Sequence, residues 1–210
     1  MKLILLSILA IGCAGHKHHT HHHRFDDATK WAKIFEDTKR DIWQQPEEVI
    51  KFAQVEKDSI VADIGSATGY FPVRLAKKAI KGRVWGIDVE PNLVNYLNKR
   101  AREGKISNLY SILGTFDDPL IPEPADRIFV VNTYHHIGKR KAYFSKLKQS
   151  YLRDKGTVVI VDFKKGKLPF GPKDHVKLSA DQVISEMELA GFKLVQKLTT
   201  LPYQYGLIFR

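Results

Sequence analysis

The sequence has almost no cysteine and little continuous apolar sequence. Its single cysteine among 210 residues, Cys13, excludes an internal disulfide and a cysteine-ligated zinc cluster. The apolar stretch at residues 3–11 has nine residues, whereas about 20 are needed to span a bilayer. The remaining composition, 43% hydrophobic and 27% charged, is ordinary for a folded protein and excludes wholesale disorder.

The length leaves room for one domain with a substantial core and is too short for two of ordinary size. The net charge of +11 is compatible with an acidic substrate, nucleic acid or an anionic membrane surface. Lys2, Lys17 and Arg24 hold three of these charges, and no acid precedes residue 25. Eight therefore belong to residues 25–210, which weakens the indication of nucleic acid.

Residues 1–24 form a separate segment. Lys2, the apolar residues 3–11, Gly12 and Cys13 follow the order of a secretory signal. The cysteine directly after Gly12 resembles a bacterial lipoprotein signal, which implies a lipid on Cys13 and attachment to a membrane. We therefore expect an exported protein, periplasmic or anchored as a lipoprotein. The alternative is an apolar start of unrelated origin on a cytoplasmic protein.

A histidine-rich tract follows the apolar stretch. Six of the nine histidines lie between His16 and His23. Imidazole clusters bind Zn, Cu or Ni, but the tract contains no Cys, Asp or Glu that would build a rigid site. We interpret it as a tether with some capacity for metal, and we place no metal site in the folded domain.

From residue 25 onward, apolar strands alternate with helical patterns. Strands are predicted at 60–64, 83–89, 108–113, 126–132, 157–163, 193–197 and 205–209. Helices are predicted at 25–35, from 46, and at 70–79, 91–103, 139–152 and 179–191. This order indicates an α/β fold: a doubly wound, mostly parallel seven-stranded sheet with helices on both faces. We assign 25–54 to an N-terminal helical lid and 55–210 to the main domain.

The loop after the first strand carries a pattern of small residues. Asp63 precedes Gly65, Ala67 and Gly69. A dinucleotide fingerprint needs glycine at the sixth position from Gly65, where Tyr70 stands, so that class is excluded. The spacing resembles the first motif of class I S-adenosylmethionine-dependent methyltransferases, Asp-x-Gly-x-Gly-x-Gly, with alanine as the middle residue.

That resemblance implies a Rossmann-like methyltransferase fold with S-adenosyl-L-methionine as cofactor. It assigns Asp63 to the cofactor ammonium, the loop N–H groups of Gly65, Ala67 and Gly69 to its carboxylate, and Asp88 to the ribose, with Val89 beside it. Asp117 or the backbone would contact the adenine. In the alternative interpretation the glycines only make a tight turn and Asp88 only caps a helix. Burying Asp63 without a cationic partner would then be costly.

The fourth strand leads into residues that the resemblance places next to the transferred methyl group. Asn132 is expected at the cofactor, and Tyr134 and His135 are expected to be catalytic, with His135 as base or orienting group. A base is needed only when the acceptor arrives protonated. Both His135 and His136 could equally be packing residues. The paired histidine resembles small-molecule methyltransferases related to those of quinone biosynthesis, and the Asn-Pro-Pro-Tyr of base-amino methyltransferases is absent.

The sequence therefore predicts methyl transfer to a small-molecule acceptor. Three lysines, Lys164, Lys165 and Lys167, would attract an anionic acceptor. Arg40 and Trp43 could cover the cofactor or pack on the sheet. Two alternatives remain open: a nucleic-acid methyltransferase, and a membrane-tethered, non-catalytic protein that binds a ligand or metal. The second has weight because S-adenosylmethionine is a cytoplasmic metabolite, whereas a signal peptide exports the domain.

Overall fold

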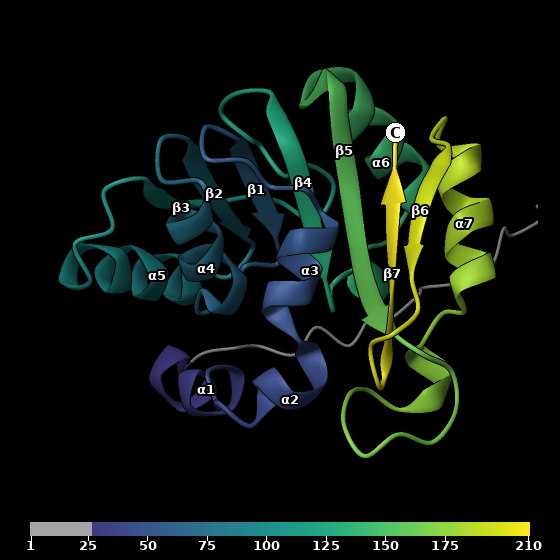
Figure 1. The fold of residues 1–210 in the computed structure, drawn as a ribbon, viewed down its shortest axis with the longest axis horizontal. Coiled ribbons are helices and arrows are strands. Elements are labelled where there is room, and N and C mark those ends of the chain that lie inside the picture. The colour runs from purple at the N-terminus through teal and green to yellow at the C-terminus, as the bar shows by residue number, and fades with distance from the viewer. Residues whose placement is uncertain (1–26) are drawn as a thin grey trace, which may run out of the picture.

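The computed structural model describes residues 27–210, which form a seven-stranded sheet in the order β3-β2-β1-β4-β5-β7-β6 (Figure 1). The strands are β1 (Ile60–Ile64), β2 (Arg83–Asp88), β3 (Leu109–Leu113), β4 (Ala125–Val131), β5 (Leu152–Phe163), β6 (Leu194–Leu198) and β7 (Gln204–Phe209). The first five run parallel, and β7 is antiparallel to both β5 and β6. The predicted doubly wound, mostly parallel sheet is confirmed.

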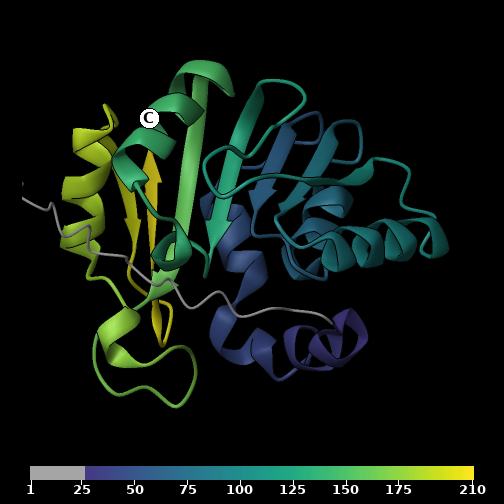
Figure 2. The same cartoon turned by 180° about the vertical axis from the view of Figure 1, so that it is seen from behind.

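Helices cover both faces of the sheet (Figures 1 and 2). They are α1 (Ala28–Phe35), α2 (Arg40–Gln44), α3 (Pro46–Phe52), α4 (Tyr70–Lys78), α5 (Pro91–Glu103), α6 (Arg140–Ser150) and α7 (Ala180–Leu189), with short 3₁₀ turns at Tyr134–His136 and Asp174–Val176. One core cluster joins α3, α4 and α5 to the sheet, and the other joins α6 and α7 to the opposite face. Successive strand residues supply the two clusters alternately, as a sheet buried on both faces requires.

Most predicted elements end within two residues of the observed ones. β5 is longer than predicted because it begins at Leu152, where it pairs with Ala125 before an irregularity in the ladder. The helix α2 is new. Val49 and Ile50 of α3, which the predicted lid 25–54 includes, are buried in the core cluster that also contains α4 and α5. The predicted signal peptide, tether and lipid site at residues 1–24 lie outside the described residues.

The carboxyl ends of β1, β2, β4 and β5 meet at one edge of the sheet, and α1 and α2 lie across that edge (Figure 1, bottom). We call residues 28–44 the lid. Glu36 anchors it, because its Oε1 accepts from Thr68 Oγ1 at 2.6 Å and pairs with Arg100 at 2.6 Å. Asp41 adds an ion pair with Arg74 at 3.0 Å and accepts from the Tyr70 hydroxyl.

Within residues 27–210, no helix is both long and apolar enough to cross a membrane.

Candidate functional site

The small-residue loop turns sharply at the end of β1. Gly65, Ala67 and Gly69 all have positive φ, at 78°, 46° and 99°. The N–H groups of Gly65 and Ser66 both donate to the carbonyl of Ile87, which ties the loop to the end of β2. A Cβ on Gly65 would lie 2.2 Å from Thr133 Oγ1, so only glycine fits between the loop and the end of β4.

Asp63 is a buried carboxylate at the end of β1, directly before this loop. Its Oδ1 has no hydrogen-bond partner within the described part of the chain. Burial raises its pKa well above the usual range, the nearby charge of Asp88 adds to the rise, and the Arg40 guanidinium opposes it. An unpartnered buried acceptor of this kind is unfavourable in isolation and suits a cationic donor.

Asp88 is the last residue of β2, and its carboxylate faces the same loop. Oδ2 accepts from the N–H of Ala67 at 2.9 Å, and Oδ1 accepts from the N–H of Glu90 at 3.0 Å. Burial raises the pKa of Asp88, while these backbone donors lower it. The next residue, Val89, is half-buried at the same edge of the sheet. Asp63, the loop and Asp88 therefore lie together. The N–H groups of Gly65, Ala67 and Gly69, which were predicted to face the cofactor carboxylate, instead donate to Ile87, Asp88 and Ser66.

A cavity of about 30 Å³ lies between the lid and the loop. Its walls come from the lid, β1, the loop, α4 and β4: Phe35, Arg40, Asp63, Gly65, Ser66, Ala67, Thr68, Tyr70, Phe71 and Val131. Pockets for cofactors are typically about 300–1,000 Å³. The unpartnered oxygen of Asp63 and the glycine-lined turn fit the amino-acid end of S-adenosylmethionine, but the lid must move before a molecule of that size can enter.

Two predicted cofactor residues lie differently from the expectation. The Asp117 side chain is 78% exposed and pairs loosely with Lys139 at 3.9 Å, so it is not brought to the cavity. Asn132 directly follows β4 with φ +55°, and its side-chain amide bonds to Gln44 and Gln204. Its polar atoms are therefore engaged with the protein.

Tyr134 is part of the scaffold, which corrects the prediction of a catalytic role. Its ring is fully buried against Phe144, with ring centroids 5.1 Å apart. Its hydroxyl donates to Glu186 Oε2 at 3.0 Å, and Arg140 holds the same carboxylate. Burial and Glu186 raise the pKa of Tyr134, so the phenol is neither open to an acceptor nor ready to ionise.

His135 forms a buried pair with Asp162, a residue that sequence reasoning did not select for this role. Nδ1 lies 3.0 and 2.9 Å from the two carboxylate oxygens, and the side chains are 3% and 2% exposed. The N–H of Phe163 donates to the same carboxylate at 2.8 Å. The sequence does contain a signal for Asp162: it is a charged residue within the apolar run of β5, as Asp63 is within that of β1.

Four aromatic side chains pack at the same edge of the sheet. Trp43 of the lid lies 5.7 Å from Phe163 and 5.5 Å from Phe170, measured between ring centroids, and Phe170 lies 5.9 Å from Tyr203. Trp43 does not line the cavity beside Asp63, so of the two expected positions it takes the packed one. The cluster joins the lid to the loop after β5.

Two of the three lysines predicted to attract an acceptor form hydrogen bonds that hold the loop after β5. Lys164 Nζ donates to the carbonyl of Leu201 at 2.7 Å, and Lys165 Nζ donates to that of Asp174 at 3.2 Å. The buried Lys177 donates to the carbonyl of Gly166 at 2.6 Å. These contacts hold the loop in place and engage the ammonium groups of Lys164, Lys165 and Lys177.

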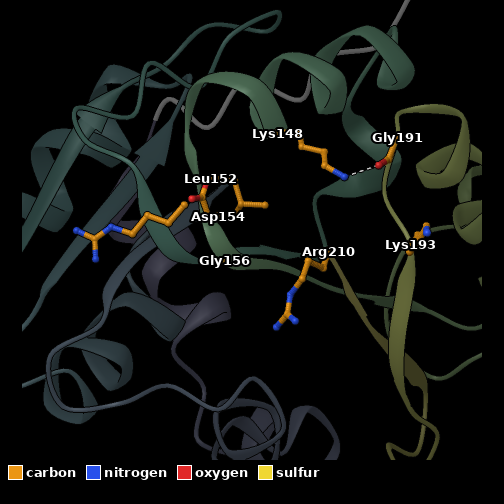
Figure 3. Close-up of a pocket in the computed structure, with 8 residues that line it drawn as sticks. Lys148, Leu152, Asp154, Gly156, Gly191, Lys193 and Arg210 are labelled. Atoms are coloured by element: carbon orange, nitrogen blue, oxygen red, sulfur yellow. Dashed lines mark hydrogen bonds between the residues drawn. The ribbon is translucent and has the colours of Figure 1, made fainter.

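A larger hollow of about 340 Å³ lies at the amino end of β5, away from the predicted site residues (Figure 3). Its lining includes Lys148, Arg153, Lys193 and Arg210. Lys148 bonds to the carbonyl of Gly191, and Arg153 pairs with Asp126 at 3.1 Å. Since two of the four cations already have partners and the hollow lies far along β5 from Asp162, it is not part of the candidate site.

Comparison with known proteins agrees with this geometry. The family model of the methyltransferase domain matches residues 55–201. The structure is similar to that of a SAM-dependent methyltransferase from Aquifex aeolicus, with a TM-score of 0.79 and 26% identity. That match covers 87% of this chain and 97% of the other.

Two curated relatives have different acceptors in their names. A tRNA (guanine(37)-N(1))-methyltransferase from Pyrococcus abyssi is 25% identical over 160 residues, which are 76% of this chain and 46% of the relative. An (S)-coclaurine N-methyltransferase from Thalictrum flavum is 24% identical over 102 residues, which are 49% of this chain and 28% of the relative. The chain thus spans less than half the length of these curated relatives.

Proposed function

The chain belongs to the methyltransferase domain family, and from this premise we propose that it transfers a methyl group from S-adenosyl-L-methionine to a small-molecule acceptor. The observation that carries the proposal is the buried, unpartnered Oδ1 of Asp63 beside a turn of small residues. When bound, the cofactor supplies a methyl group that is already activated on a sulfonium. The protein then has to orient the acceptor and exclude water.

Three groups of this chain would hold the cofactor. Asp63 would accept from its ammonium, the loop of Gly65 to Gly69 would lie against its carboxylate, and Asp88 would accept from the ribose hydroxyls. Asp88 already binds two backbone N–H groups, which fixes the carboxylate at the end of β2. The lid covers this part of the site and keeps water from it.

His135 is our candidate for the group that takes a proton from the acceptor. Asp162 holds Nδ1, which leaves Nε2 as the nitrogen for an acceptor hydroxyl. The same contact would also serve a scaffold role, because it joins the end of β4 to β5.

Two substitutions separate these roles. If His135 is the base, His135→Ala should lower kcat about 100-fold or more, while cofactor affinity stays unchanged. His135→Gln keeps a polar side chain but has no base, so its kcat should be equally low.

The class of acceptor is tested by following the labelled methyl group. The full-length protein is incubated with methyl-labelled S-adenosylmethionine and, separately, with the small-molecule fraction and the RNA fraction of a bacterial extract. The proposal expects label in small molecules, absent from an Asp63→Ala variant. Label in RNA alone would favour the second candidate, a tRNA methyltransferase, which is supported by the name of the Pyrococcus abyssi relative.

We also propose that the protein is exported and anchored through a lipid on Cys13. The support is the order of Lys2, the apolar residues 3–11, Gly12 and Cys13. Labelling cells with a fatty-acid analogue should mark the wild type and not Cys13→Ser, and only the wild type should fractionate with membranes. Unlabelled wild type in the cytoplasm would reject the anchor and leave the methyltransferase proposal intact.

A further inference from the structure

Three side-chain amides from distant parts of the chain meet at the carboxyl edge of the sheet. Gln44 Nε2 donates to Gln204 Oε1 at 2.7 Å, Gln204 Nε2 donates to Asn132 Oδ1 at 2.5 Å, and Asn132 Nδ2 donates to Gln44 Oε1 at 3.1 Å. Within this cycle each amide donates one bond and accepts one. We call this closed cycle the amide ring. It joins the lid (Gln44) to the end of β4 (Asn132) and the start of β7 (Gln204).

Two members of the ring are buried and Asn132 is half-buried, and this makes its bonds depend on one another. Gln44 and Gln204 are both 0% exposed. Removing Gln204 leaves the Nε2 donor of Gln44 and the Oδ1 acceptor of Asn132 without their partners in the ring. Each such group costs about 1–3 kcal/mol where it is buried. Separating the lid from the sheet likewise breaks two of the three bonds at once. The ring therefore favours two arrangements of the lid, joined or released, over intermediate positions.

The ring also contacts Arg40 through Gln44. Gln44 Oε1 accepts from Arg40 Nε at 3.3 Å and from its terminal nitrogen NH2 at 3.2 Å. The other terminal nitrogen donates to the carbonyl of Phe35 at 2.9 Å, and the guanidinium lies 4.0 Å from the centre of the Tyr70 ring. Arg40 and Phe35 line the cavity together with Asp63. The amide ring therefore contacts the lid side of the cofactor cavity through Gln44 and Arg40.

From these contacts we propose that Gln44, Asn132 and Gln204 are positioning residues that hold the lid closed over the cofactor cavity. The ring breaks to admit or release the cofactor and re-forms to return Arg40 and Phe35 to their places opposite Asp63. The need for opening follows from the cavity of about 30 Å³, which no nucleoside fits. The inference rests on the proposed function only in naming S-adenosylmethionine as the molecule that passes.

The first test needs no cofactor. Hydrogen exchange is measured on the full-length protein for the backbone amides of residues 42–45 in wild type, Gln204→Leu and the control Gln196→Leu. Gln196 is an exposed glutamine on the neighbouring strand β6. We expect exchange in Gln204→Leu to be at least tenfold faster at 42–45 and unchanged in β1 and β4. Wild-type rates at 42–45 in a folded Gln204→Leu would overturn the proposal.

A second variant keeps the test valid if Gln204→Leu does not fold. Gln44→Glu retains oxygens that accept from Arg40 and Asn132 but cannot donate to Gln204. It should also exchange faster at 42–45, whereas Gln44→Glu with wild-type exchange would show that the ring does not hold the lid.

The second test measures release of S-adenosylhomocysteine by stopped flow. Ring variants should release it at least tenfold faster than wild type and Gln196→Leu, with a raised KM for the cofactor and a smaller change in kcat. An equal loss of kcat with unchanged release would indicate a structural role only and would reject the proposal. If wild type binds no S-adenosylhomocysteine, the proposed function fails, and the exchange experiment still decides whether the ring holds the lid.

Discussion

Asp63 explains at the scale of one residue why this edge of the sheet can bind a ligand. A carboxylate near the end of a buried strand loses its water, and within the described part of the chain Asp88 and Arg40 contribute charge nearby. Its Oδ1 remains without a hydrogen bond. Burying this oxygen without a hydrogen bond is unfavourable, and the ammonium group of a ligand would compensate for that cost. Such a group is typical of a binding site rather than of a packed core.

The raised pKa of Asp63 predicts a pH dependence of stability. Because the folded state holds this proton more tightly than the unfolded chain does, folding stability falls as pH rises above about 4, the ordinary pKa of aspartate, until it reaches the folded pKa. The slope is at most about 1.4 kcal/mol per pH unit for one proton. Urea unfolding of the cofactor-free protein should show Asp63→Asn gaining stability relative to wild type over this range.

The matched control for this prediction is Asp154→Asn, at an exposed aspartate in β5. Its stability relative to wild type should not follow the same pH trend. A difference between Asp63→Asn and wild type that stays constant from pH 4 upward would contradict a raised pKa of the buried Asp63.

Ala67 adopts a left-handed backbone conformation within the motif. It stands where the family pattern has glycine, and it adopts φ +46°, a conformation that costs an ordinary residue roughly 1–2 kcal/mol. Ala67→Gly should therefore leave the free energy of unfolding within about 1 kcal/mol of wild type, since relief of strain offsets the added freedom of the unfolded chain. Ala67→Val should lower it by more than about 1 kcal/mol. Chemical unfolding measures both, and a fully tolerated valine would refute this explanation.

At the scale of elements, the sequence predicts what depends on neighbours along the chain. The strand-loop-helix around Asp63, the Pro91 start of α5 and the Ser179 cap of α7 all follow local patterns, and the structure confirms them. The helix α2 was missed because it has five residues and no apolar periodicity. The pairs His135–Asp162 and Gln44–Gln204 join segments 27 and 160 residues apart, which a single sequence does not connect.

The cap of α7 gives a prediction at this scale. Ser179 Oγ accepts from the N–H of Gln182 at 3.1 Å, at the start of a helix whose Val183 and Met187 are fully buried. Ser179→Ala should lower the free energy of unfolding by about 1 kcal/mol, and Ser179→Asp should retain the cap. The transition midpoint in urea reports both changes. Equal losses in the two variants would mean that the hydroxyl is not acting as a cap.

The equivalent cap in the lid should behave differently. Asp27 Oδ1 accepts from the N–H of Lys30 at 3.0 Å and begins α1, which crosses the site rather than filling the core. Asp27→Ala should therefore weaken cofactor binding while the midpoint of global unfolding changes little.

At the scale of the whole molecule, charge and shape favour a small acceptor. The carboxyl edge is covered by the lid and by the loop after β5 (Figure 1), and two cations of that loop, Lys164 and Lys165, donate to backbone carbonyls. The basic hollow lies at the other end of β5. The basic hollow and the cavity beside Asp63 therefore share no lining residue, although eight net charges belong to residues 25–210.

This distribution predicts weak and unspecific binding to nucleic acid. In gel shifts with bulk tRNA, complexes of the full-length protein should disappear as salt rises to roughly 200 mM, because phosphate contacts weaken steeply with salt. A saturable complex with one tRNA that survives at that salt concentration would favour the tRNA candidate over a small acceptor.

The most direct test of the central claim is calorimetry of the full-length protein with S-adenosylmethionine and S-adenosylhomocysteine. We predict one site per chain in wild type and at least tenfold weaker binding in Asp63→Ala and Asp88→Ala. Asp117→Ala should bind as wild type does, because its side chain lies exposed and away from the cavity. A folded wild-type protein that binds neither molecule, or one whose affinity is unchanged by Asp63→Ala, would contradict the account.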